Sequence, residues 1–159
     1  MSQARTLYAW YRRAVGSSQP EPTAAAGDIV LYDGLCGLCS RVVRYIAQHD
    51  ARRRFRFATL DSDAARALLE GAAVPSLLPD SVILVEAGGA VLVESDAALR
   101  IAGSLDGPVR HLARLRFVPR PLRDGVYRLV ARTRYRIFGR HDVCEIPAPW
   151  MRERFLDGA

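Results

Sequence analysis

Two cysteines separated by two residues are the part of the sequence best suited to chemistry. Cys36 and Cys39 enclose Gly37 and Leu38, and this spacing lets the two sulfur atoms close a small disulfide ring. A thiolate at one cysteine can attack a disulfide in another molecule, and the second cysteine can then resolve the mixed disulfide. The pair therefore predicts dithiol-disulfide exchange.

The residues around the pair predict a strand, a loop and a helix. Residues 29–32 form an apolar run rich in β-branched side chains, and residues 41–47 carry apolar side chains at helical spacing. The pair would then lie where the helix begins, and the positive end of the helix dipole would stabilise a thiolate there. We expect Cys36, which precedes the first turn, to be the exposed nucleophile and Cys39 to be the more sheltered resolving thiol.

Asp33 lies three residues before Cys36. A buried carboxylate at this position would take or deliver a proton during exchange. Asp-Gly is also a common turn dipeptide, so a structural role explains Asp33 about as well. Its negative charge would oppose thiolate formation at Cys36, and the helix dipole and an arginine would have to compensate.

The cysteine pair has two other interpretations, a structural pair or half of a zinc site. Its position between a predicted strand and a predicted helix favours redox chemistry. Cys144 lies three residues after His141, and these two residues with Cys36 and Cys39 would make a zinc ligand set. For Cys144 we rank an inert thiol first, a third redox thiol second and a zinc ligand third, because the chain between it and the pair is long.

At this point the sequence also carries a family resemblance. The stretch Asp33-Gly34-Leu35-Cys36-Gly37-Leu38-Cys39 resembles the Asp-X-X-Cys-X-X-Cys signature of the DCC family of predicted thiol-disulfide oxidoreductases. Similar pieces follow in the same order at residues 80–85, 95–99 and 134–139. The resemblance implies a thioredoxin-like fold and dithiol-disulfide exchange, and it favours a functional role for Asp33. It also implies that Arg134, in an Arg-Tyr-Arg motif, points back toward Cys36.

The other periodicities are those of a complete α/β domain. Strands are predicted at 28–32, 52–60, 81–85 and 90–93, and helices at 37–48, 62–70 and 95–103. This order, β-α-β-α-β-β-α, is that of a thioredoxin-like fold. We divide the chain into an N-terminal helix and linker (1–27), a thioredoxin-like core (28–105) and a basic helical C-terminal extension packed on the core (106–159).

The residues before the third strand depart from the thioredoxin pattern. Thioredoxin relatives place a cis-proline there, facing the active disulfide and the substrate. Asp80 and Ser81 hold that position here, and Pro79 comes one residue early. We therefore expect Asp80 and Ser81, together with Arg134, to contact the substrate.

Charge is concentrated in the C-terminal third of the chain. The formal net charge is +6, and every basic side chain other than histidine is arginine, which excludes chemistry that needs a lysine. A predicted helix over 121–138 carries an apolar stripe and a row of arginines. The stripe consists of Val126, Leu129, Val130, Thr133 and Ile137, and the row of Arg128, Arg132, Arg136 and Arg140. Such a row predicts a solvated face first and an anionic partner second.

The expected protein is a cytoplasmic thiol-disulfide oxidoreductase without a cofactor. No apolar run approaches the roughly 18 residues of a membrane span, and the N-terminus lacks the continuous apolar core of a signal peptide. The expected partner is a protein or small molecule that carries a thiol or a disulfide, and nucleic acid is not expected. Two alternatives stay open: a zinc-stabilised interaction module, and a thioredoxin-like scaffold that binds anionic partners through its basic helices.

Overall fold

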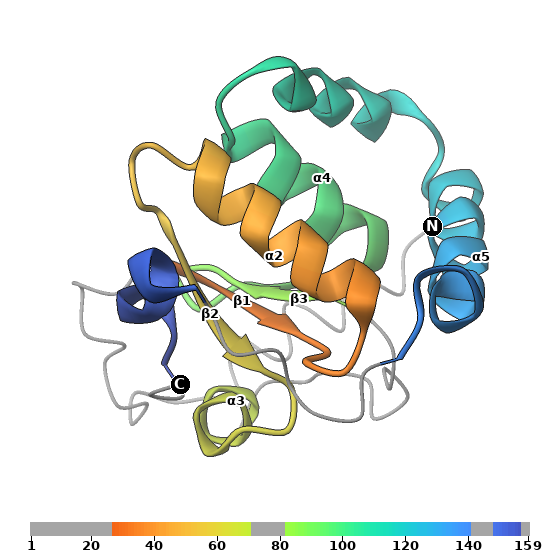
Figure 1. Ribbon diagram of the computed structural model, residues 1–159. Helices are drawn as coiled ribbons and strands as arrows, with labels where there is room; N and C mark the ends of the chain where they lie inside the picture. Colours follow the sequence, from red (N-terminus) through yellow and green to blue (C-terminus); the bar gives the residue numbers. More distant parts are fainter. Residues whose placement is uncertain (1–26, 71–81, 141–147, 157–159) are drawn as a thin grey trace.

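A four-stranded mixed sheet forms the centre of the protein in a computed structural model, which describes residues 27–70, 82–140 and 148–156 (Figure 1). The strands are β1 (Asp28–Tyr32), β2 (Phe55–Thr59), β3 (Ile83–Val85) and β4 (Val91–Val93), in the order β2-β1-β3-β4. β1 and β2 are parallel, whereas β3 is antiparallel to β1 and β4 is antiparallel to β3. This arrangement confirms the predicted α/β, thioredoxin-like fold.

Helices cover both faces of the sheet because the central strand is apolar on both sides. In Figure 1, α2 (Gly37–His49) and α4 (Glu94–Ser104) lie on one face, and α3 (Asp63–Leu69) lies on the other. Side chains alternate along β1, so Val30 and Tyr32 pack in the cluster that includes α2 and α4. Ile29 and Leu31 pack in the cluster on the α3 side. The helix that carries the cysteines is thus anchored along the sheet.

The chain after α4 continues as a 3-10 helix, η1 (Pro108–Phe117), and a long helix, α5 (Arg120–Phe138). η1 packs against α4, and α5 contacts both α2 and α4. No side chain of η1 is buried. None of the helices in the described part of the chain is long and apolar enough to cross a membrane.

The apolar stripe predicted on α5 faces away from the core. Val126 and Leu129 are each 64% exposed and Ile137 is 66% exposed, whereas Asp124 and Arg134 are the buried residues of the helix. An amphipathic helix normally packs its apolar side against the core. Here polar contacts hold the opposite side of the helix, because Asp124 accepts a hydrogen bond from the hydroxyl of Ser95 in α4.

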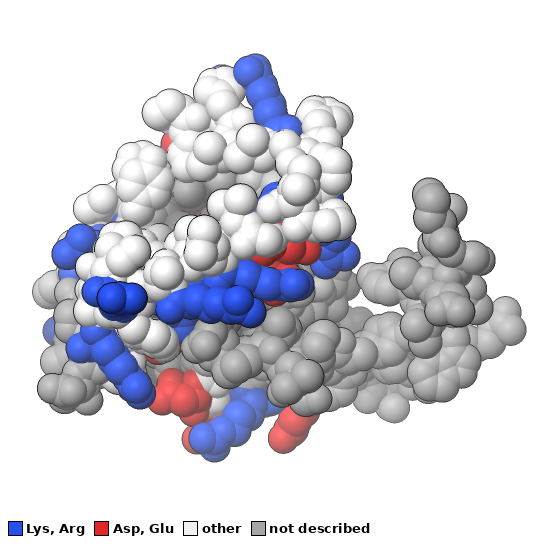
Figure 2. Space-filling model, turned by 90° about the vertical axis from the view of Figure 1, so that its right-hand side faces the viewer, with Lys and Arg blue, Asp and Glu red and all other residues white. Residues whose placement is uncertain are grey.

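The row of arginines is partly neutralised by acidic side chains at the start of α4. Arg128 binds both carboxylate oxygens of Glu94, at 2.8 and 3.1 Å. Arg123, outside the predicted row, lies 2.6 Å from Asp96. Figure 2 views the side on which α5 lies and shows basic side chains as a band across a largely neutral surface. The basic residues therefore also help to attach α5 to the core.

The last described segment contributes to the core itself. A short 3-10 helix, η2 (Pro149–Arg154), precedes Phe155, whose ring lies 5.4 Å from that of Phe57 in β2. The buried guanidinium of Arg154 pairs with Asp50 and donates to the carbonyl oxygens of Ala47 and Phe55. The C-terminal segment thereby ties the end of α2 to the edge strand.

Candidate active site

Cys36 occupies the N-cap position of α2. Its backbone is extended (φ −89°, ψ 116°), and its Sγ accepts a hydrogen bond from the backbone N–H of Cys39 at 3.3 Å. At most N-caps an oxygen of Ser, Thr, Asp or Asn takes this bond. The sulfur of Cys36 is thus the atom toward which the helix N-terminus directs a donor, and this favours negative charge on it.

Both cysteines are buried, and the expectation of an exposed Cys36 is wrong. Cys36 is 0% exposed and Cys39 is 6% exposed. The backbone of Cys36 forms an isolated antiparallel bridge with Arg140, and the N–H of Gly37 donates to the carbonyl oxygen of Gly139 at 3.4 Å. Gly139 ends α5 with φ +79°, a conformation that glycine adopts without strain. The residues at the end of α5 therefore cover Cys36 although more than a hundred residues of sequence separate them from it.

Asp33 has the turn role considered from the sequence, and its second carboxylate oxygen contacts two residues of α5. Its Oδ1 accepts the N–H of Leu35 at 2.9 Å, which closes the turn between β1 and the cysteine pair. Its Oδ2 accepts from Nη2 of Arg134 at 3.0 Å and from the hydroxyl of Tyr135. Nη2 of Arg134 also lies 2.9 Å from the Tyr135 hydroxyl. The structure thus brings Asp33, Arg134 and the cysteine pair together.

The surroundings of the site shift the pKa values of Cys39 and Arg134. Burial raises the pKa of the Cys39 thiol, and the adjacent Cys36 sulfur raises it further, whereas Arg134 acts in the opposite direction. Burial alone would lower the pKa of Arg134. The hydrogen bond to Tyr135 and the two cysteine sulfurs outweigh this effect, so the pKa of Arg134 is raised above its ordinary value. Arg134 is therefore a permanent positive charge beside the pair, and Cys39 is a neutral thiol at neutral pH.

Tyr135 is a site residue that the sequence analysis did not identify. Burial and the hydrogen bond to Asp33 raise the pKa of Tyr135, so its phenol stays protonated and remains a donor to the carboxylate. Its ring also lies under the guanidinium groups of Arg134 and Arg140, at 4.7 and 5.7 Å. The available signal was its place beside Arg134 in the Arg-Tyr-Arg motif.

Other predicted site residues lie outside the residues that the structure describes. These are the substrate-side pair Asp80 and Ser81, and the possible third redox thiol or zinc ligands Cys144 and His141. Within ranges 27–70, 82–140 and 148–156, no group of three or more His, Cys, Asp or Glu side chains has an arrangement that could hold a metal ion.

Comparisons with known proteins identify a family. The model of the DCC1-like thiol-disulfide oxidoreductase family matches residues 30–140. The chain is 35% identical over 128 residues to the uncharacterised protein YuxK of Bacillus subtilis (strain 168), covering 80% of this chain and 93% of that protein. It is 40% identical over 121 residues to a chloroplastic DCC family protein of Arabidopsis thaliana, covering 74% of this chain and 69% of the relative. No solved structure matches the chain.

Proposed function

Because the chain belongs to the DCC1-like thiol-disulfide oxidoreductase family, we propose that it catalyses dithiol-disulfide exchange through Cys36 and Cys39. The observation that carries this proposal is the hydrogen bond from the N–H of Cys39 to Cys36 Sγ at the start of α2. A thiolate gains most from such a donor, because hydrogen bonds to charged acceptors are stronger than those between neutral groups. Cys36 is therefore assigned as the nucleophile.

The reaction transfers two electrons from the protein to a disulfide. The Cys36 thiolate attacks one sulfur of the substrate, so that a mixed disulfide forms and the other substrate sulfur leaves as a thiolate that takes up a proton. The sulfur of Cys39 then attacks Cys36 Sγ and releases the second substrate thiol. The protein ends as the Cys36–Cys39 disulfide, and the substrate ends as two thiols. The reverse sequence oxidises a substrate dithiol.

The second step needs help because Cys39 must lose a proton from a buried thiol whose pKa is raised. We assign this assistance to Asp33, whose carboxylate is held in place by Arg134 and Tyr135. Arg134 supplies a positive charge that offsets the carboxylate and favours the thiolate. It is a positioning residue in this scheme, because its guanidinium bonds to Asp33 and Tyr135.

Access to Cys36 requires a local movement. The bridge from Arg140 to Cys36 and the hydrogen bond from Gly37 to Gly139 must open before a bulky substrate can form a mixed disulfide. The proposed substrate is a protein or small molecule bearing a thiol or disulfide. Asp80, Ser81 and Arg134 stay proposed contacts to the substrate on sequence grounds. The proposed location stays cytoplasmic, although the plant relative is named as chloroplastic.

Single cysteine variants test the proposal. The reduced protein is mixed with a disulfide substrate, and both the thiols released and the mass of the protein are measured. Cys36→Ser should lose exchange, and Cys39→Ser should accumulate a mixed disulfide on Cys36. Cys144→Ser distinguishes the two interpretations of the third cysteine, because an inert thiol predicts full exchange and a third redox thiol predicts reduced exchange. Full activity of Cys36→Ser would refute the proposal. A mixed disulfide that accumulates on Cys39 in Cys36→Ser, with none on Cys36 in Cys39→Ser, would reverse the two roles.

The two alternatives gain no support from a specific observation. Two of the four residues of the zinc module, His141 and Cys144, lie outside the described residues. In the anionic-partner scaffold, the basic helices would act through arginines, but Arg128 is already paired with Glu94. Redox chemistry at Cys36 and Cys39 therefore stays the proposed function.

A further inference from the structure

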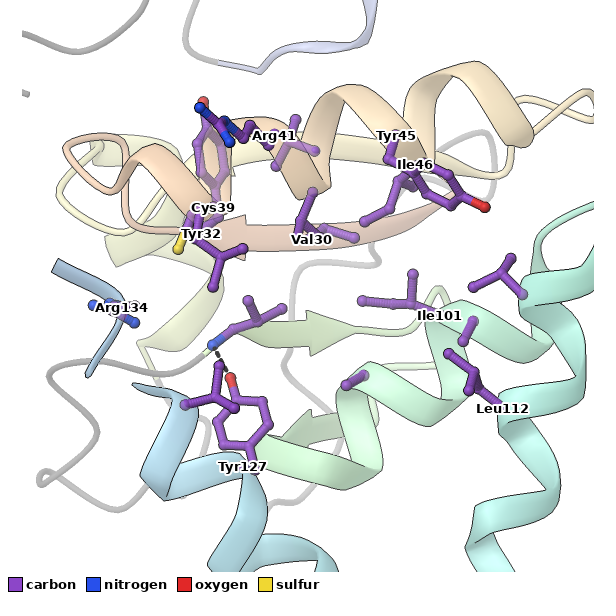
Figure 3. A pocket seen from close by; sticks show the side chains of 18 of the residues that line it. Val30, Tyr32, Cys39, Arg41, Tyr45, Ile46, Ile101, Leu112, Tyr127 and Arg134 are labelled. Carbon is purple, nitrogen blue, oxygen red and sulfur yellow. Dashed lines mark hydrogen bonds between the residues drawn. The ribbon is translucent and has the colours of Figure 1, made fainter. Parts of the chain in front are cut away.

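A cavity of about 610 Å³ lies beside the cysteine pair, between α2, α4, η1 and α5. Figure 3 shows Cys39 and Arg134 toward one end of this cavity, and Ile101 and Leu112 toward the other. Cys39 belongs to its lining, whereas Cys36 does not. The cavity is therefore the space from which a bound molecule would contact the pair on the Cys39 side.

The lining of the cavity is almost entirely apolar. The strand and helix residues that form it are chiefly aliphatic, and the charged residues among them are Arg41 and Arg134. Arg134 is bonded to Asp33, and the hydroxyl of Tyr127 accepts the backbone N–H of Val82 at 2.9 Å. An occupant would thus find hydrocarbon surface along most of the cavity and polar groups mainly at the thiol end.

The rim of the cavity leaves apolar side chains exposed to water. Val42 and Tyr45 of α2 are 39% and 38% exposed, Leu112 of η1 is 48% exposed, and Val130 of α5 is 45% exposed. Covering such surface with hydrocarbon is favourable because apolar area is removed from water. A volume of this size also falls within the range of sites that bind small molecules.

A peptide is a poor match for this cavity. Each residue of a bound peptide would bring an N–H and a carbonyl that need hydrogen-bond partners. The lining offers few polar atoms to supply them, and an unpaired amide in an apolar site is costly. A hydrocarbon chain or ring makes no such demand.

We propose that the cavity binds the apolar part of the substrate, so that the substrate class is a small thiol or disulfide carrying an aliphatic or aromatic group. The substrate sulfur lies at the end of the cavity marked by Cys39, and Cys36 attacks it after the bridge between Cys36 and Arg140 has opened. The hydrocarbon extends toward Leu112. The exchange is the one written above, in which the protein dithiol is oxidised and the disulfide becomes two thiols. This inference rests on the proposed function and adds the chemistry of the group attached to sulfur.

A homologous series of disulfides tests the inference. Alkyl 2-hydroxyethyl disulfides with chains from ethyl to hexyl have nearly constant sulfur reactivity and differ in hydrocarbon length. The second-order rate constant for oxidation of the full-length reduced protein should rise about fourfold per added methylene until the cavity is filled. A rate constant independent of chain length would overturn the inference and leave the exchange proposal intact. No reaction with any member would contradict the proposed function itself.

Cavity-filling variants locate the effect. Ala98 of α4 and Ala131 of α5 both line the cavity, and Ala98→Trp and Ala131→Trp should each flatten the dependence of the rate constant on chain length. Ala67→Trp, on the exposed side of α3, is the matched control and should keep the full dependence on chain length. Melting curves identify any variant that fails to fold. If one of the two Trp variants does not fold, the other shows whether the cavity causes the dependence on chain length. An undiminished dependence in a folded filling variant would overturn the inference, as would a peptide disulfide of equal reactivity that reacts faster than the hexyl compound.

Discussion

Replacing Arg134 by methionine should lower the stability of the protein and slow the second step of exchange. The side chain of Arg134 is 4% exposed, and its Nη2 lies 3.0 Å from Asp33 and 2.9 Å from the hydroxyl of Tyr135. Methionine keeps a long unbranched side chain but removes the charge and the donors. The carboxylate of Asp33 then loses its ion-pair partner at a site that is largely shielded from water.

The contacts of Arg134 and Asp33 give the expected loss in the free energy of unfolding. Removing one partner of a buried ion pair costs about 3 to 5 kcal/mol. Asp33 would keep its bonds from the N–H of Leu35 and the hydroxyl of Tyr135, and its side chain is 17% exposed. The lower end, about 3 kcal/mol, is therefore expected, which for a chain of this size corresponds to a fall in melting temperature of about 6 to 12 °C.

Arg134→Met should also change the pH dependence of the step in which Cys39 resolves the mixed disulfide. Arg134 lowers the pKa of Cys39 and so opposes the effect of burial. Without this charge the pKa of Cys39 rises further, and the pH dependence of the resolving step moves to higher pH. Thermal unfolding followed by circular dichroism measures the stability change. Release of thiol from the preformed mixed disulfide, measured from pH 6 to pH 10, reports the kinetic change.

Two further variants are controls for the stability loss expected in Arg134→Met. Arg136→Met removes an exposed arginine from the same helix and should change the melting temperature by less than about 2 °C, because surface substitutions cost little. The double variant Asp33→Asn with Arg134→Met should regain part of the lost stability, because no carboxylate is left unpaired. An Arg134→Met variant that melts like the unmodified protein, or an Arg136→Met variant that loses as much stability, would contradict a stabilising role of the buried ion pair.

Two other predictions concern stability. The reduced protein should lose stability as the pH rises above about 9, the ordinary pKa of a cysteine thiol such as Cys39 in the unfolded chain. The folded protein keeps this thiol protonated to higher pH, so the free energy of unfolding falls by up to about 1.4 kcal/mol per pH unit. Urea unfolding at several pH values measures it, and an equal slope in Cys39→Ala would contradict the assignment. Arg154→Met should lower the free energy of unfolding by about 4 kcal/mol, because it leaves the buried carboxylate of Asp50 without its ion-pair partner. Adding Asp50→Asn should restore part of this loss, and a fall in melting temperature below about 4 °C would refute the prediction.

The sequence by itself determined the elements near the cysteine pair. β1 occupies residues 28–32 as predicted, and α2 begins at Gly37, because an apolar run followed by apolar residues at helical spacing is local information. Ser62 caps α3 through the N–H of Ala65, as its residue type indicated. The strand order along the chain was predictable for the same reason, and with it the thioredoxin-like fold.

Tertiary structure alone decided how the site is closed and what surrounds it. The family resemblance implied that Arg134 points toward the cysteine pair, but only the tertiary structure shows that it pairs with Asp33 across 101 residues of sequence. Arg140 covers Cys36 from a similar separation. Periodicity shows that α5 has an apolar stripe but does not show which way the stripe faces, because that depends on what the opposite side of the helix contacts. Here the contacts of Asp124 and Arg134 with the core outweigh the usual burial of the apolar side. The same packing of α5 and η1 beside α2 and α4 creates the cavity next to Cys39.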